Sequence, residues 1–71
     1  MKEYVVIFEC AGTNYSAYVP DLPGCISTGK TLAETENNIK EAIELYIDTL
    51  REDGQPIPEP SLKAKAISVA A

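Results

Sequence analysis

The side chains that could carry out chemistry in this chain are almost all carboxylates. The sequence contains 11 Asp and Glu, two cysteines and no histidine among 71 residues. Without histidine no Ser-His-Asp or Cys-His arrangement can form, and two thiolates do not complete a tetrahedral zinc site. A metal-dependent nuclease needs several carboxylates around paired ions, and the predicted strands and turns offer only Glu3, Glu9 and Asp21. The residue types favour a binding protein over an enzyme, and we expect no cofactor.

Asp21 is the most distinctive of these carboxylates because prolines hold it on both sides, in the segment 20–24. Pro20 and Pro23 cannot donate to a strand ladder, so the segment ends a strand and forms a constrained turn. One interpretation makes Asp21 a partner contact or a remnant nuclease carboxylate. The commoner role for such an Asp is to accept hydrogen bonds from backbone amides two residues further on.

The charge of the chain is concentrated in one segment. Its net charge is −5, and residues 31–53 carry two basic and seven acidic side chains. No basic stripe is present to bind phosphates, which disfavours direct binding of nucleic acid by a monomer. An acidic surface suits a basic protein partner, although a solvated helix face would have the same composition.

The apolar runs are short. Residues 4–8 form the longest one near the N-terminus, and they are too few for a membrane span or for the core of a signal peptide. We therefore expect a cytoplasmic protein with no membrane association.

The apolar pattern predicts strands over 2–10, 15–19 and 25–28, a helix over about 32–53 and a last strand over 64–69. The order is β-β-β-α-β, which predicts an α+β two-layer sandwich in one domain spanning the whole chain. We expect the strand order third, second, first, fourth, in a mixed sheet with one helix on it.

The helix has clear signals at both ends. Thr31 and Glu34 have the spacing of a capping box, and Gly54 followed by Pro56 predicts the stop. Apolar residues recur inside it at helical spacing: Leu32, Ile39, Ala42, Ile43, Tyr46, Ile47 and Leu50.

One helix cannot cover this sheet completely. Four strands span about 19 Å, whereas a helix is about 10 Å wide. Either Tyr4, Val6 and Phe8 or the alternate pair Val5 and Ile7 must lie on the uncovered face. We expect a homo-oligomer, with a dimer as its simplest form.

Two cysteines in a reducing compartment rarely pair. In the expected strand order a whole strand separates Cys10 from Cys25, so about 9–10 Å lies between them, whereas a disulfide needs Cα atoms within about 7 Å. We expect both side chains to pack in or near the core.

Two stretches in this order and spacing are distinctive: Pro-Asp-Leu-Pro-Gly-Cys at 20–25 and Asp-Gly-Gln-Pro-Ile-Pro-Glu-Pro at 53–60. With Tyr-Val-Val-Ile-Phe at 4–8, they make the chain resemble the N-terminal domain of HicB antitoxins, the HicB-like or UPF0150 group. The resemblance covers nearly the whole chain. It implies a partial ribonuclease H-like fold and a role in blocking HicA, a small basic mRNA-cleaving toxin.

HicB proteins of full length add a DNA-binding segment that this sequence does not contain, so the resemblance does not extend to DNA binding. Two alternatives stay open: a solitary HicB-like domain with another regulatory role, and a reduced ribonuclease H-like nuclease that uses Asp21 and a metal. For the antitoxin role we predict capture of the toxin by the acidic helix face and by the turn at 21–24. The predicted partner-binding residues are Asp21, Leu22, Pro23, Gly24, Glu41, Glu44 and Asp48.

Overall fold

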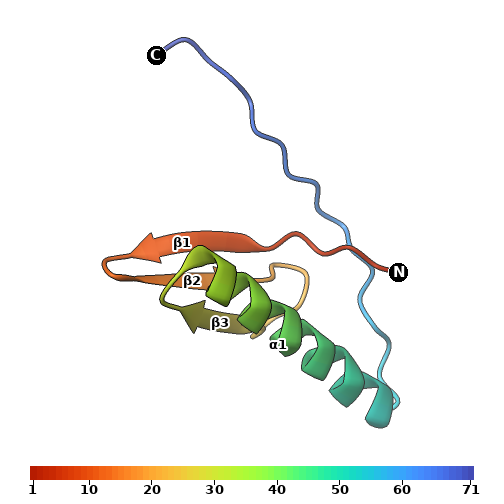
Figure 1. The fold of residues 1–71 in the computed structure, drawn as a ribbon. Coiled ribbons are helices and arrows are strands. Elements are labelled where there is room, and N and C mark those ends of the chain that lie inside the picture. Colours follow the sequence, from red (N-terminus) through yellow and green to blue (C-terminus); the bar gives the residue numbers. More distant parts are fainter.

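A computed structural model describes all 71 residues and contains three strands followed by one helix. Strands β1 (Ile7–Ala11), β2 (Asn14–Tyr18) and β3 (Ile26–Gly29) form an antiparallel sheet in the order β1-β2-β3. Helix α1 (Leu32–Glu52) packs on one face of this sheet (Figure 1). The predicted α+β class and the order of these four elements are confirmed.

The first hairpin is closed by the turn Gly12–Thr13, since Ala11 pairs with Asn14 across it. Gly12 has φ 68°, a left-handed conformation that glycine adopts without a steric cost. Such a two-residue turn matches the twist of antiparallel strands and therefore fixes their register. Phe8 consequently lies opposite Ala17, and both face the helix.

Between β2 and β3 the chain makes two consecutive tight turns. The Leu22 amide donates to the Val19 carbonyl at 3.0 Å, and the Cys25 amide donates to the Leu22 carbonyl at 3.0 Å. These bonds turn the Leu22 side chain inward, where it is fully buried. The prolines expected to end the strand do so, and the turn also supplies a core residue.

Both predicted helix signals are present. The Glu34 amide donates to Thr31 Oγ1 at 3.1 Å, while the Glu34 carboxylate accepts from the Lys30 amide at 3.0 Å rather than from the Thr31 amide, which a standard capping box would use. At the other end, the Gln55 amide donates to the Leu50 carbonyl at 2.8 Å and Gly54 has φ 68°. This is the Schellman arrangement, in which glycine takes the left-handed position after the helix.

The core is small. Five apolar residues are buried: Ala17, Val19, Leu22, Cys25 and Ile39. Tyr4, Val6 and Phe8 pack against them, which decides that this set faces α1 and that Val5 and Ile7 belong to the opposite face. On that open face Ile7, Tyr18 and Ile26 stand side by side across the three strands and remain partly exposed.

The last predicted strand, 64–69, does not form within this chain. Residues 55–71 have no partner in any ladder, and the C-terminal segment leads away from the sheet (Figure 1). β1 is also shorter than the predicted strand 2–10 because Pro20 stops β2 and leaves residues 2–6 with no strand to pair with. The sheet is therefore three-stranded and antiparallel rather than four-stranded and mixed.

The cysteines differ in their surroundings. Both thiols are free, and Cys25 is buried as predicted, where burial raises its pKa. Cys10 is exposed, so the prediction that it packs in or near the core is wrong. The reason is that α1 lies over β3 and β2 and does not reach the end of β1.

The approach of α1 to β3 depends on Gly29. A Cβ atom at this position would lie 2.5 Å from Thr35 Oγ1 and 2.8 Å from the Thr35 backbone nitrogen. Thr35 is fully buried, and its hydroxyl donates to the Thr31 carbonyl at 2.7 Å. Neither atom can move without breaking the first turn of the helix.

We predict that Gly29→Ala lowers the free energy of unfolding by about 1–3 kcal/mol, because the added methyl group pushes the first turn of α1 away from β3. Urea denaturation followed by circular dichroism measures this change. Thr28→Ala, at the neighbouring exposed position of the same strand, is the matched control and should differ from the parent by less than about 0.5 kcal/mol. Equal stability of the two variants would contradict the prediction.

Candidate partner-binding surface

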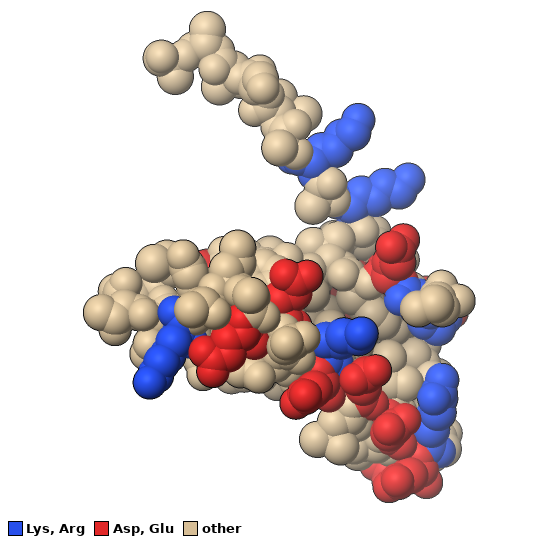
Figure 2. All heavy atoms as spheres, viewed as in Figure 1, with Lys and Arg blue, Asp and Glu red and all other residues tan.

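The outward side of α1 carries an acidic ridge, which we define as Glu34, Glu41, Asp48 and Glu52. The first three follow one another at seven-residue spacing and the fourth comes four residues later, so all four lie in one line along the helix. Figure 2 shows acidic side chains gathered along the helix. The Arg51–Asp48 ion pair measures 3.8 Å, but both side chains are about two-thirds exposed. The pair is therefore weak, and it cancels little of the negative electrostatic field of the ridge.

An apolar residue interrupts this ridge. Leu45 lies between Glu41 and Asp48 and is 69% exposed, with acidic side chains on one side of it and an apolar groove on the other. This large aliphatic side chain stands beside two carboxylates and is not part of the buried core. Our predicted site omitted Leu45, and the available signal was a leucine that falls outside the apolar spacing of the helix.

Leu45 also lines a shallow groove of about 470 Å³ between α1 and the start of β3. The groove runs past the turn that we predicted as a contact, because Gly24 lines it together with Tyr46. The Tyr46 hydroxyl donates to the Pro23 carbonyl at 3.0 Å and ties the turn to the helix. The structure therefore brings two parts of the predicted site together, Pro23 and Gly24 from the turn and the flank of α1.

The other predicted contact residues are distributed differently. Glu41 and Asp48 are exposed on the ridge, as the helical spacing requires. Glu44 is also exposed, but it leans toward β1 and lines a second groove on that side. Leu22 is buried in the core, so its side chain does not contribute to the surface.

Asp21 has a role that neither of our interpretations foresaw. Its carboxylate accepts from the Ser61 amide at 2.9 Å and from the Ser61 hydroxyl at 2.6 Å, across 40 residues. These two bonds lower the pKa of Asp21, and the bond from the Ser61 hydroxyl has the larger effect. Asp21 thus fastens the proline-rich connector to the turn. Its hydrogen-bond donor is the distant Ser61, not the backbone amides of the turn that we expected.

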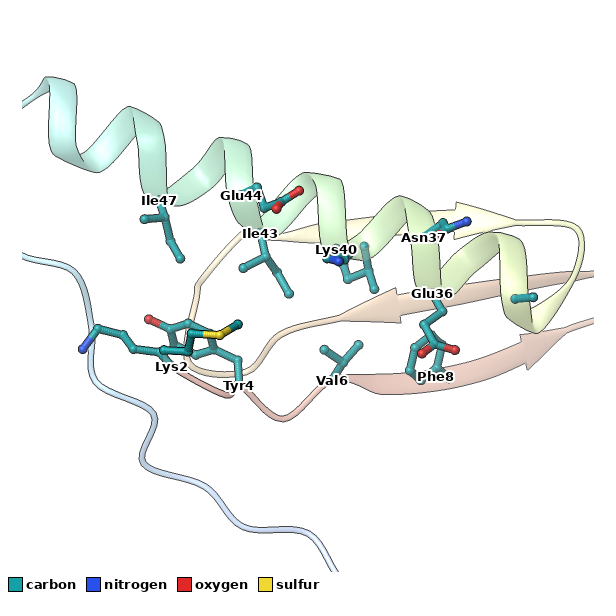
Figure 3. A pocket seen from close by; sticks show the side chains of 13 residues that line it. Lys2, Tyr4, Val6, Phe8, Glu36, Asn37, Lys40, Ile43, Glu44 and Ile47 are labelled. Atoms are coloured by element: carbon teal, nitrogen blue, oxygen red, sulfur yellow. The ribbon is translucent and has the colours of Figure 1, made fainter.

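The second groove, which we call the β1 groove, lies between the N-terminal segment and α1 and measures about 810 Å³ (Figure 3). Tyr4, Val6 and Phe8 line one wall, and Ile43 and Ile47 line the other. Sequence reasoning did not find it, because its existence depends on where along the sheet the helix sits.

No group of three or more His, Cys, Asp or Glu side chains in this chain is arranged to hold a metal ion. Nor does the structure contain a helix with the length and apolarity that crossing a membrane requires. What the surface offers is an acidic ridge, an exposed leucine and two apolar grooves, all of which suit contact with another protein.

Comparison with known proteins assigns the chain to a family. The family model for the HicB-like antitoxin of bacterial toxin-antitoxin systems matches residues 4–69. The chain belongs to the HicB-like antitoxin family. Among its relatives, a UPF0150 protein of Synechocystis is 47% identical over 78% of this chain and 70% of the relative. A UPF0150 protein of Thermoplasma acidophilum is 45% identical over 82% of this chain and 84% of the relative.

A solved structure of a HicA3 and HicB3 toxin-antitoxin complex contains a chain with the same fold. It matches with a TM-score of 0.72 and 30% identity, covering 84% of this HicB-like chain and 70% of that chain. The resemblance inferred from the turn and the connector is therefore confirmed at the level of family and fold.

We predict that the Ser61 amide resonance follows the ionisation of Asp21, with a midpoint below the ordinary Asp pKa of about 3.9. The folded-state pKa is lowered, so the tether is present above the unfolded pKa and is lost as the pH falls through the folded pKa. An NMR titration from neutral pH downwards measures the midpoint.

Ser61→Ala removes the hydroxyl bond and should move the Asp21 midpoint back toward its ordinary value. Ser68→Ala, which changes the same residue type in a fully exposed part of the chain, is the control and should leave the midpoint unchanged. An Asp21 midpoint at the ordinary value in the parent protein would show that the tether is absent.

Proposed function

We propose that this chain is a cytoplasmic, non-enzymatic antitoxin-type module that binds and occludes a basic toxin of the HicA type. The observation that carries the proposal is the acidic ridge interrupted by Leu45, beside an apolar groove bordered by the 21–24 turn. Membership of the HicB-like antitoxin family supports it, as does a structural neighbour found in a toxin-antitoxin complex.

The two components of this surface would act at different stages of binding. Glu41 and Asp48 create a negative field that attracts a basic partner and orients it during encounter. Leu45, 69% exposed, then supplies apolar area that is removed from water on contact. Pro23 holds the neighbouring turn in place through its bond to Tyr46, and Gly24 lines the groove there.

The alternatives predict different observations. A solitary HicB-like domain would have no small basic protein encoded beside it, whereas the antitoxin role requires a short basic neighbour that contains a histidine. A reduced ribonuclease H-like nuclease would need Asp21 free to bind a metal, but both oxygens of this carboxylate accept from Ser61. Incubation of the protein with RNA and magnesium or manganese tests that activity directly.

We also propose that the chain self-associates, with a dimer as the expected form. Only five apolar residues are buried in 71, which is a small core for an independent domain. In addition, Ile7, Tyr18 and Ile26 form an exposed apolar row on the open face of the sheet. Burial against a second chain would add the stabilisation that the single core does not provide.

We predict that Glu41→Lys/Asp48→Lys lowers the association rate with the neighbouring basic protein at least tenfold at low salt and flattens its salt dependence. Stopped-flow or surface-plasmon-resonance measurements over a range of ionic strengths give both quantities. Glu3→Lys/Glu9→Lys makes the same change in net charge away from the ridge and is the matched control. Equal slowing by both pairs would indicate a general charge effect and contradict the proposed site.

Sedimentation equilibrium at tens of micromolar should give a mass of at least twice the 7.7 kDa of one chain. The physical reason is the exposed apolar area that a monomer would leave in water. A mass near 7.7 kDa would rule out self-association in this concentration range.

A further inference from the structure

The outer edge of β1 is an unused strand edge beside an unfilled groove. β1 ends the sheet, and no backbone hydrogen bond joins its outer side to any other segment. Because Ala11 and Asn14 flank a two-residue turn as a hydrogen-bonded pair, the alternate residues Phe8 and Cys10 direct their backbone groups outward. An added strand would bond to these groups and place every second side chain in the β1 groove.

The C-terminal segment has the form of such a strand. Residues 62–71, which we call the arm, are all exposed and run in extended form away from the body (Figure 1). Ile67 and Val69 within it are 74% and 78% exposed. The arm also raises the radius of gyration to 13.8 Å, compared with about 11 Å for a compact chain of this length.

The side chains of the arm match the β1 groove. In an extended chain Lys63, Lys65, Ile67 and Val69 point to one side. The groove is mainly apolar at the end formed by Tyr4, Ile43 and Ile47, where Lys2 and Glu44 also line it, and it carries Glu36 at the end beside Phe8 (Figure 3). An arm running antiparallel to β1 would place its two aliphatic residues at the apolar end and its lysines near Glu36.

The antiparallel direction indicates which molecule supplies the arm. The chain's own connector is held against the segment before β1 and the turn after β2, through Lys2 to Glu59, Tyr4 to Pro58 and Asp21 to Ser61. From there its own arm could only run parallel to β1, which would put the lysines at the apolar end of the groove. An arm that enters from the Ala11 end must therefore come from another molecule.

We propose that residues 62–71 of one copy add as an antiparallel strand to the β1 edge of a second copy, with Ile67 and Val69 filling its β1 groove. By two-fold symmetry the exchange is reciprocal and buries two arms at once. The proposal rests on the self-association proposed above and names the contact that produces it. It does not depend on toxin binding, which uses the ridge of α1.

The first test measures the mass of arm variants in the full chain. Ile67→Asp/Val69→Asp should shift the sedimentation mass from dimer to monomer at tens of micromolar without altering the circular dichroism of the folded body. Leu45→Asp, a single aliphatic-to-acid change at a similarly exposed position outside the arm, is the control and should remain dimeric. A dimer unaffected by the arm substitutions would overturn the proposal while leaving self-association intact.

The second test locates the arm. A mixed sample of one ¹³C,¹⁵N-labelled and one unlabelled copy should give intermolecular NOEs from Ile67 and Val69 to Tyr4 and Val6. Contacts between the arm and β1 within one chain would identify an intramolecular fourth strand and overturn the exchange. A dimer with intermolecular NOEs only among Ile7, Tyr18 and Ile26 would show that open sheet faces associate instead, and this too would overturn it. A parent protein that is monomeric would refute both self-association and the exchange.

Discussion

The close approach of α1 to β3 at Gly29 determines how this small protein is arranged. The absence of a side chain at Gly29 lets the backbone of Thr35 come nearer to the strand than any Cβ would allow. The helix is consequently fixed over β3 and β2, and because it is narrower than the sheet, it leaves the β1 side of the same face uncovered. The β1 groove is a consequence of that placement.

The same placement sets the surface proposed for partner binding. With its inner side on β3 and β2, α1 presents its acidic ridge to solvent and opens a shallow apolar groove toward Gly24. Leu45 lies between the ridge and this groove, which combines long-range electrostatic attraction with a site for apolar contact. The two grooves lie on opposite flanks of the helix, so toxin binding and arm exchange would use separate surfaces.

The connector after the helix has a structural role that its proline content alone does not reveal. Asp21 holds Ser61, and Tyr4 holds the Pro58 carbonyl, so the connector is fixed against the start of β1 before the arm leaves the body. A carboxylate between two prolines therefore acts here as an anchor for a distant segment. This anchor is what sets the direction of the arm.

Local signals in the sequence determined the elements and the family. Alternating and helical apolar spacing placed three strands and the helix, while Thr31 and Gly54 marked the helix ends because capping depends on neighbouring backbone groups alone. The turn at 20–25 and the connector at 53–60 identified the family. Tertiary structure decided which face of β1 meets the helix, that Leu22 is core, that Asp21 binds Ser61 and that residues 64–69 find no partner in their own chain. These outcomes depend on contacts between residues far apart in sequence, and no local pattern encodes which distant group will be in reach.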